Sequence, residues 1–502
     1  CFALPRAPSF GLGSPTVVRS KMDVESLQRV GTWLQSTLSA DMQTRQAAEE
    51  ALRLCEGNAG HVVCLFRLAA DASIPADDAI RQAAVINMKN IIGRRWEPRQ
   101  PPKHLRERGE EALPALTDSD KAAVRDNLCT AIAVSPPVIR SQLGLCLRTI
   151  AAADYPERWP ALLTTIGSGL VTPEHSQLVG ALYSLRILMK NYEFKRDEKR
   201  KPLTELVAAT FPTLLELAAG ILRNAPTVAN SEMALLIAKI MWSSMQTALP
   251  PWLLQPGNLD PWFETLLGLL EQPLPEPAES HPSDEEEAIK WAPFKVKKRV
   301  SSLFHRLIQR YGNPTRKIEG PDANELLAFA RHFQDSLSSR CLNAMLAMLG
   351  RQHAGHILPG RVSMLCLQYI EESIKYKLTY AMLKPQLVQL FSEVVLPTLS
   401  FSQSDADLWE EDPHEFVRKE YDMIEDFYSP RTAAQNLLQA MTKNRPKDCL
   451  NGIVVTCSQV LERSQTSPDA ASLRAKDGAL YAVGALHSRL AKKDIYRASL
   501  EP

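Results

Sequence analysis

The sequence lacks an excess of charge of either sign and lacks an apolar run long enough to cross a bilayer. Its 58 Lys and Arg residues are matched by 57 Asp and Glu residues, so the formal net charge at pH 7 is +1. A chain with this balance is not drawn as a whole to nucleic acid or to an anionic membrane. The best candidate for a span, Leu206–Leu222, is interrupted by Pro212 and Glu216. We therefore expect no membrane and no direct nucleic-acid partner, and any electrostatic recognition must be local.

The sequence also lacks the motifs of common enzymes and of metal sites. Phosphate loops of the GxxxxGK(S/T) and GxGxxG types, the zinc motif HExxH and the nucleophile motif GxSxG are all absent. The pair His353 and His356 has no third ligand nearby in the sequence. The segment Asp405–Trp409 begins like a calcium loop, but no glycine follows at the turn. We therefore expect that the protein is not an enzyme and has no catalytic residue, no bound metal and no cofactor.

The cysteines show no pattern. There are nine of them, and no two form a CxxC pair. An odd, scattered set is typical of a reducing compartment, which indicates the cytosol or the nucleus.

What the sequence does have is helical periodicity, and short words recur in it at a regular spacing. RQAA occurs at Arg45–Ala48 and Arg81–Ala84, 36 residues apart, and SQL occurs at Ser141–Leu143 and Ser176–Leu178, 35 residues apart. Each word stands near the head of a segment with apolar residues at helical spacing, which we interpret as the second helix of a helix pair. Helix-pair repeats have periods of roughly 33 to 47 residues. Because convincing β alternation is absent, the sequence predicts an all-α fold, an α-solenoid of about nine or ten antiparallel helix pairs.

Several segments stand outside this periodicity. Residues 1–21 carry three basic residues, no acid and no helical pattern, so we predict a disordered or non-native leader that packs against nothing. Longer loops are predicted at Glu97–Lys103, Gln272–Glu287 and Ser400–Pro413. The run FKVKKR at Phe294–Arg299 follows an acidic loop. We interpret it as the solvated start of a helix, with a nuclear-localisation or nucleic-acid patch as the alternative.

Six longer segments occur in one order along the chain and together point to a family. They are RQAAVINMKNIIGRRW (Arg81–Trp96), DYPERWPALL (Asp154–Leu163), LMKNYEFK (Leu188–Lys195), LFHRLIQRYG (Leu303–Gly312), LWEEDPHEFVRKEYDMIEDFYSPRTAAQNLL (Leu408–Leu438) and KDGALYAVGAL (Lys476–Leu486). From Met22 to its end, the chain resembles the importin-β superfamily of nuclear transport receptors, in the branch of importins seven and eight. Two features depart from the family pattern: the near-neutral charge, and Pro293, which leaves the start of the helix near Lys290–Val300 open.

The resemblance implies HEAT repeats stacked into a right-handed superhelix, in a chain of roughly half the family's usual length. It also implies Ran-GTP, FG-repeat nucleoporins and basic protein cargo such as ribosomal proteins or histones as partners, and a location in cytoplasm, nucleus and nuclear pore. On this basis we expect Ran-binding repeats at 22–192, middle HEAT repeats at 193–400, an acidic insertion at 401–430 and further, truncated HEAT repeats at 431–502.

The resemblance places Ran contacts on the concave face, which is formed by the inner helices of the repeats. We expect Arg81–Trp96 and Ser176–Tyr192 to be such helices, and we take the candidates from the face opposite the apolar stripe or from its border. The candidates are Asn87, Lys89, Asn90 and Arg94 in the first helix and Arg186 and Lys190 in the second. Arg81 points to the apolar side, and we predict that it is structural and paired with an acid. The alternative for the candidates is an ordinary wetted surface.

The segment Phe401–Pro430 holds ten acids and two bases. We expect an exposed insertion in which Trp409 and Phe416 hold the chain against the solenoid, since unpaired carboxylates are costly to bury. Our hypothesis is that its acids attract a basic patch on Ran, and the candidates are Glu410, Glu411, Asp412 and Glu415. The alternative is that the charge serves solubility alone.

Three functions remain open from the sequence. The leading one is a nuclear import receptor, whose cargo competes with Ran-GTP. The second is an export receptor, which binds cargo together with Ran-GTP. The third is a HEAT-repeat scaffold, such as a phosphatase regulatory subunit, with no dependence on a GTPase.

Overall fold

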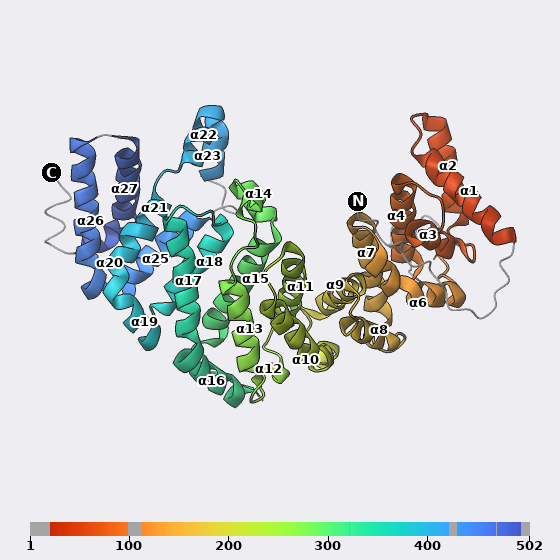
Figure 1. Ribbon diagram of the computed structural model, residues 1–502, viewed down its shortest axis with the longest axis horizontal. Coiled ribbons are helices and arrows are strands. Elements are labelled where there is room, and N and C mark those ends of the chain that lie inside the picture. The colour runs from red at the N-terminus through yellow and green to blue at the C-terminus, as the bar shows by residue number, and fades with distance from the viewer. Residues whose placement is uncertain (1–20, 99–112, 321, 421–428, 468, 493–502) are drawn as a thin grey trace, which may run out of the picture. The chain divides into compact units, whose positions relative to one another are not determined.

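The computed structural model describes residues 21–98, 113–320, 322–420, 429–467 and 469–492. In these ranges the regular elements are helices throughout, as the sequence predicted (Figure 1). The helices form two compact units: an N-terminal unit of Cys1–Leu214 and Lys239–Pro250, and a C-terminal unit of Leu215–Ala238 and Pro251–Pro502. The predicted leader lies outside the described residues except for Lys21, and the domain boundaries drawn from the sequence stay predictions.

The N-terminal unit is built from antiparallel helix pairs. Its helices are α1 (Lys21–Thr37), α2 (Met42–Cys55), α3 (His61–Ala70), α4 (Asp78–Arg95), α6 (Asp118–Val134), α7 (Pro137–Asp154), α8 (Ala161–Leu170), α9 (His175–Tyr192), η1 (Asp197–Arg200) and parts of α10 (Lys201–Arg223) and α11 (Val228–Ser244). In the first four pairs α1 packs on α2, α3 on α4, α6 on α7 and α8 on α9. Both RQAA words and both SQL words lie in second helices, as predicted. The second helices α4, α7 and α9 also pack on one another in chain order and form a row.

The arginine that recurs in the RQAA word has a structural cause. Arg45, Arg81 and Arg140 each stand fourth in their second helix, and each donates to backbone carbonyls at the end of the preceding first helix or just beyond it. The bonds join Arg45 to Ser39 O (2.9 Å), Arg81 to Leu68 O (3.2 Å), Asp71 O (3.0 Å) and Ile74 O (2.7 Å), and Arg140 to Ile132 O (3.0 Å), Ala133 O (3.4 Å) and Ser135 O (3.0 Å). The last turn of a helix leaves carbonyls without intrahelical partners, and a cation is favoured there. Arg81 is therefore structural, but its partners are carbonyls rather than the acid that we predicted.

Two of the family-like segments meet at one buried carboxylate. Asp154 is 3% exposed and accepts from Trp96 Nε1 (3.1 Å) and Arg125 Nη1 (3.3 Å). Arg158 Nε lies 3.0 Å from its other oxygen. A buried charge is stable only when it is paired and hydrogen-bonded. The segments around Trp96 and Asp154 thus join α4, α6, α7 and the turn that follows.

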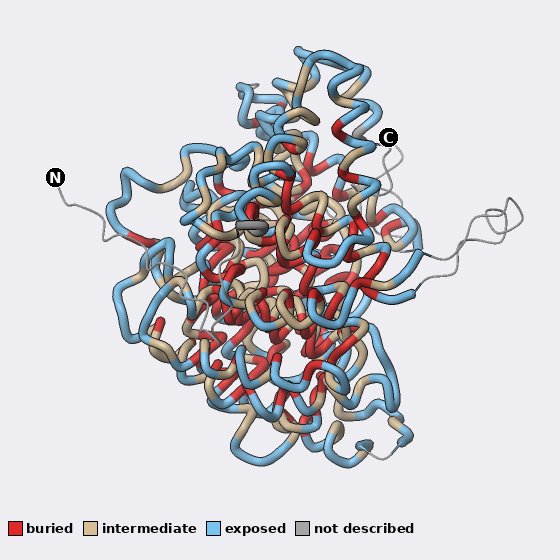
Figure 2. Tube along the Cα trace, turned by 90° about the vertical axis from the view of Figure 1, so that its right-hand side faces the viewer, coloured by how far each residue is buried: buried red, intermediate tan, exposed pale blue. Residues whose placement is uncertain are grey.

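The C-terminal unit continues the helical array. After the parts of α10 and α11 that belong to it come α12 (Pro251–Leu254), α13 (Leu259–Glu271), η2 (Ala278–Ser280), α14 (Glu285–Lys290), α15 (Ala292–Arg306), η3 (Leu307–Tyr311), α16 (Ala323–His332), η4 (Phe333–Leu337), α17 (Ser338–His353), α18 (Gly360–Ser373), α19 (Lys377–Leu383), η5 (Lys384–Gln386), α20 (Leu387–Leu390), η6 (Phe391–Val395), α21 (Leu396–Leu399), α22 (Gln403–Glu411), α23 (Pro413–Glu420), α25 (Pro430–Asn444), α26 (Pro446–Thr466) and α27 (Ala470–Leu490). Packing runs from α13 through α15 and α18 to α25, and α26 packs on α27. Figure 2 draws the whole trace, and it shows buried residues toward the inside and exposed residues along the outer turns of the described helices.

The lysine run at Phe294–Arg299 differs from its interpretation as a solvated helix start. Helix α15 begins at Ala292 with Pro293 in its first turn, where the missing N–H of proline costs little. Lys297 is only 4% exposed, and its Nζ donates to the carbonyls of Leu270 (2.6 Å) and Gln272 (2.9 Å) at the end of α13. Burial lowers the pKa of Lys297 to about 8. This lysine closes a helix end inside the C-terminal unit, as the arginines do in the N-terminal unit.

The segment Asp197–Arg223, which includes α10, has the length and apolar composition of a membrane span. Its side chains Leu206, Val207 and Phe211 are fully buried against other helices. Burial of this kind is what a core helix of a helical array requires.

Candidate partner-binding surface

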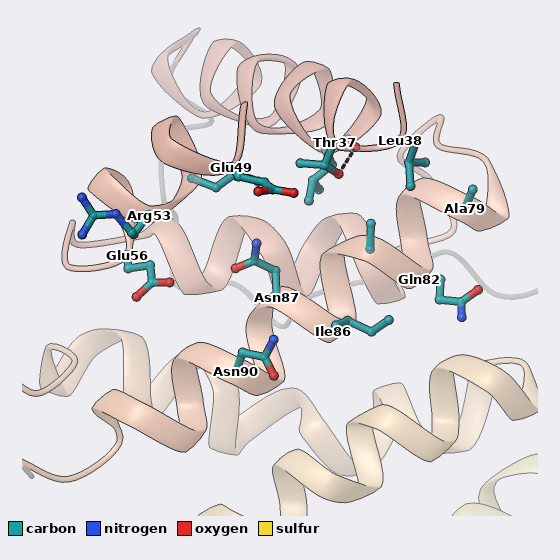
Figure 3. A pocket seen from close by; sticks show the side chains of 13 residues that line it. Thr37, Leu38, Glu49, Arg53, Glu56, Ala79, Gln82, Ile86, Asn87 and Asn90 are labelled. Atoms are coloured by element: carbon teal, nitrogen blue, oxygen red, sulfur yellow. Dashed lines mark hydrogen bonds between the residues drawn. The ribbon is translucent and has the colours of Figure 1, made fainter. Parts of the chain in front are cut away.

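Two neighbouring hollows open beside α4 in the N-terminal unit. The first, of about 560 Å³, lies between α1, α2 and α4. Figure 3 shows Asn87 and Asn90 projecting from α4 on one side of it and Glu49 and Glu56 on the other. Of the candidates predicted from the sequence, Asn87 and Asn90 therefore line this first hollow.

The second hollow, of about 980 Å³, runs along the row of α4, α7 and α9. It is lined by Lys89, Asn90, Gly93, Arg94, Trp96, Glu97, Leu145, Arg148, Thr149, Ala152, Ala153, Lys190, Asn191, Phe194 and Lys195. Four of the candidates predicted from the sequence thus lie around one concavity: Lys89, Asn90 and Arg94 on α4 and Lys190 on α9. Asn90 borders both hollows.

The second hollow is strongly basic. Among the described residues that line it, the cations are Lys89, Arg94, Arg148, Lys190 and Lys195, and the one acid is Glu97. Glu97 is paired with Arg158 (2.6 Å), and Arg94 is paired with Glu56. The other four cations form no ion pair with any acid in the described ranges. Their combined field favours an anionic partner.

Arg186 departs from its prediction as a contact residue. Its side chain is 18% exposed and lies 3.9 Å from Glu193. Its Nη1 donates to Ser243 Oγ (2.8 Å), which in turn donates to Glu193 Oε2 (2.7 Å). Burial lowers the pKa of Arg186. The face analysis gave it a polar side, but that side is covered by α11, so we correct its role from partner contact to packing between α9 and α11.

The segment Ser400–Pro413 contains a helix where we predicted a loop. Helix α22 begins with a capping box in which Ser402 and Asp405 bond each other's backbone N–H groups. Helix α23 follows, and the two pack on each other as a hairpin that stands away from its neighbours in Figure 1. The hairpin is attached at its base, where Asp405 pairs with Arg431 of α25 at 3.0 Å. No residue of α22 is buried, so this part of the insertion is exposed although it is helical.

The aromatic residues of the hairpin pack mainly on one another. The Trp409 ring lies 5.4 Å from the Phe416 ring, and Phe416 lies 5.7 Å from Phe401, which follows α21. Trp409 remains 49% exposed. These three rings therefore hold the two helices of the hairpin together, and the expected contact of Trp409 and Phe416 with the solenoid stays a prediction.

The four candidate acids of the hairpin differ in their surroundings. Asp412 Oδ1 accepts from the backbone N–H of Glu415 (3.0 Å), and Glu415 accepts from Arg418 Nε (2.6 Å). Glu410 and Glu411 are exposed and form no ion pair within the described part of the chain. These two glutamates are the carboxylates most available to a partner. The last part of the predicted insertion, residues 421–428, lies outside the described residues.

Sequence reasoning missed part of the second hollow. Leu145 and Arg148 lie on α7 at i, i+3 spacing, opposite the buried Leu143 and Leu147, so the face analysis applied to α4 and α9 would have found them. Phe194 follows α9 in a turn, where helical periodicity gives no signal. In the described ranges no group of three or more His, Cys, Asp or Glu side chains is placed to hold a metal ion.

Comparisons with known proteins agree with this architecture. A family model described as the importin-beta N-terminal domain matches residues 48–134, and one described as Cse1 matches residues 341–496. An importin beta-like SAD2 homolog of Arabidopsis thaliana is 36% identical over 468 residues, which cover 93% of this chain and 43% of the plant protein. Importin-8 of Mus musculus is 29% identical over 478 residues, which cover 95% of this chain and 45% of the mouse protein. The chain therefore spans less than half the length of these relatives.

Solved structures show the same fold. The exportin Cse1 in its cargo-free, cytoplasmic state matches with a TM-score of 0.70 and 17% identity, over 92% of this chain and 46% of that one. Yeast importin-beta (Kap95p) matches with a TM-score of 0.55 and 13% identity, over the same shares.

The helix pairs and these structural matches define the class of the protein as a HEAT-repeat α-solenoid, as predicted. The chain belongs to the importin-β superfamily, and its relatives place it with the importin-7 and importin-8 type, which confirms the resemblance seen in the sequence.

Proposed function

We propose that the protein is a nuclear import receptor that binds Ran-GTP through the row of α4, α7 and α9. The observation that carries the proposal is the second hollow, where candidates chosen from two separate helices lie around one basic concavity. The family model of the importin-beta N-terminal domain matches residues 48–134, and this range includes α4, the first helix of the row. Concave surfaces of repeat proteins are their usual binding surfaces.

The proposal includes the other partners of a transport receptor. We propose FG-repeat nucleoporins for passage through the pore, and basic proteins such as ribosomal proteins or histones as cargo. The protein would then move between cytoplasm and nucleus and gather at the nuclear envelope. The hairpin of α22 and α23 would attract a basic patch of Ran over long range through Glu410 and Glu411, which are exposed.

A binding experiment tests the direction of transport. The 502-residue chain is immobilised and offered Ran loaded with GTP or with GDP, with and without a basic cargo protein. Import predicts selective binding of the GTP form and release of cargo by it. Equal binding of the two nucleotide states, or none, would contradict the proposal and favour a scaffold without GTPase dependence.

An export receptor is the second candidate, because the Cse1 family model matches residues 341–496 and Exportin-2 of Drosophila melanogaster is 24% identical over 489 residues. In the same experiment export predicts that cargo and Ran-GTP strengthen each other's binding. The higher identity to importin-8 favours import.

A further inference from the structure

Two large apolar side chains stand exposed among the cations of the second hollow. Phe194 is 71% exposed and Leu145 is 42% exposed, and both line the hollow. Single exposed apolar residues are common on protein surfaces. Two in one concavity, together with cations that mostly lack an acid partner among the described residues, have the composition of a binding surface with an apolar centre and a charged rim.

The turn that carries Phe194 is held by hydrogen bonds of the residues on either side of it. Glu193, one residue earlier, is 7% exposed and accepts from Ser243 Oγ at 2.7 Å. The backbone N–H of Lys195, one residue later, donates to Tyr192 O at 3.0 Å. Arg186 completes this support through its bond to Ser243. Because its neighbours are held, the turn that carries Phe194 would lose little backbone freedom on binding.

Three of the cations that line this hollow have no acid partner in the described ranges. Arg148 lies three residues after Leu145 on α7, and Lys195 follows Phe194 directly. Lys190 lies one turn before Phe194, on α9. All three are exposed and lack an ion pair with the described acids. Glu97 is engaged by Arg158 and so does not cancel them.

We infer that the second hollow is a socket for an apolar side chain flanked by acidic residues on the GTPase, with Phe194 and Leu145 as its apolar floor and Arg148, Lys190 and Lys195 as its rim. This inference rests on the proposed function and deepens it by naming the chemistry of the partner's contact. Charge complementarity selects an acidic segment, and the exposed ring selects an apolar residue within it. Arg186 is a positioning residue of the socket.

The test measures the dissociation constant of the 502-residue chain for Ran loaded with a non-hydrolysable GTP analogue. Phe194→Ala removes the apolar floor, and we expect binding to weaken by about tenfold or more at every salt concentration. The double variant Arg148→Glu/Lys195→Glu reverses the rim. We expect it to weaken binding by about tenfold or more at low salt and by less at high salt, since surface charges are screened.

Two matched controls test whether truncating any exposed apolar side chain, or reversing any two exposed lysines, weakens binding. Val171→Ala truncates a side chain that is 72% exposed outside the hollow, and Lys199→Glu/Lys201→Glu reverses two exposed lysines that do not line it. Both controls should bind as the unchanged chain does, and all variants should keep its melting temperature.

The outcomes distinguish the two proposals. If the unchanged chain does not bind Ran-GTP, the proposed function fails and this inference fails with it. If the unchanged chain binds but Phe194→Ala and the rim variant bind equally well, the socket is refuted while the proposed function stands. If only the rim variant weakens binding, the partner contributes charge without an apolar residue, and the inference is wrong in its central claim.

Discussion

Helix α9 packs tightly against α6 at Gly180, and this contact makes a sharp prediction. A Cβ atom added to Gly180 would lie 2.5 Å from both Cα and Cβ of Ala133. Carbon atoms in contact prefer separations of about 3.5–4.0 Å. Gly180→Ala therefore requires the two helices to move apart by about 1 Å, because the opposing atoms are backbone and Cβ rather than a flexible side-chain tip.

The size of the effect follows from two opposing contributions. Alanine in a helix interior gains about 1 kcal/mol over glycine. Overpacking of a well-filled contact costs about 1–3 kcal/mol and occasionally more, and a backbone clash belongs at the upper end. We expect Gly180→Ala to lower the free energy of unfolding of the N-terminal unit by about 2 kcal/mol. For 150–250 residues this corresponds to a fall in melting temperature of about 4–8 °C.

The same substitution in the neighbouring helix is the control. Gly167 lies within α8, and an added Cβ there meets no atom within 4 Å. Gly167→Ala should therefore raise the free energy of unfolding by up to about 1 kcal/mol, through helix propensity alone. Urea unfolding of both variants, followed by hydrogen exchange in α6 and α9, measures the difference. If Gly180→Ala were as stable as the unchanged chain, the close packing of α6 on α9 would be refuted.

Three further predictions concern single features of the two units. Arg81→Ala removes the donors to three carbonyls, and we expect the free energy of unfolding measured in urea to fall by about 2–3 kcal/mol. A fall of less than about 0.5 kcal/mol would show that water takes the place of the arginine at these carbonyls. Burial lowers the pKa of His305 from 6.5 to about 4. Because the unfolded chain then binds the proton more tightly than the folded one, stability falls as pH drops from about 6.5 to about 4, by at most about 3 kcal/mol. His305→Gln should flatten this part of the pH profile, and an unchanged profile would contradict the assignment. Glu410→Lys/Glu411→Lys should slow Ran-GTP association, most at low salt, without changing the melting temperature. An unchanged association rate at low ionic strength would make the hairpin a solvated spacer.

Face analysis of the sequence located the helices of the candidate surface because burial on a helix repeats locally. Asn90 and Lys190 were assigned to polar faces from helical spacing alone, and both are exposed in the structure. Lys297 could not be assigned this way, since its carbonyl partners lie 27 and 25 residues earlier in the chain and leave no local pattern. The helix α22 was missed for a different reason. Apolar periodicity reports burial, and α22 buries no residue, although its capping box of Ser402 and Asp405 is visible in the sequence.

Recurrence along this chain has two physical causes. Arg45, Arg81 and Arg140 recur because their second helices meet the same problem, the unpaired carbonyls that end the helix before each of them. A second cation follows each of these arginines eight residues later and faces a hollow: Arg53 lines the first hollow, and Lys89 and Arg148 line the second. Eight residues are a little over two helical turns, so the second cation lies along the same helix from the first and stands free of the carbonyls that the first one binds. A partner that lies along the row of α4 and α7 therefore meets a cation at the same position of both helices, and this repeated charge favours an acidic surface on that partner.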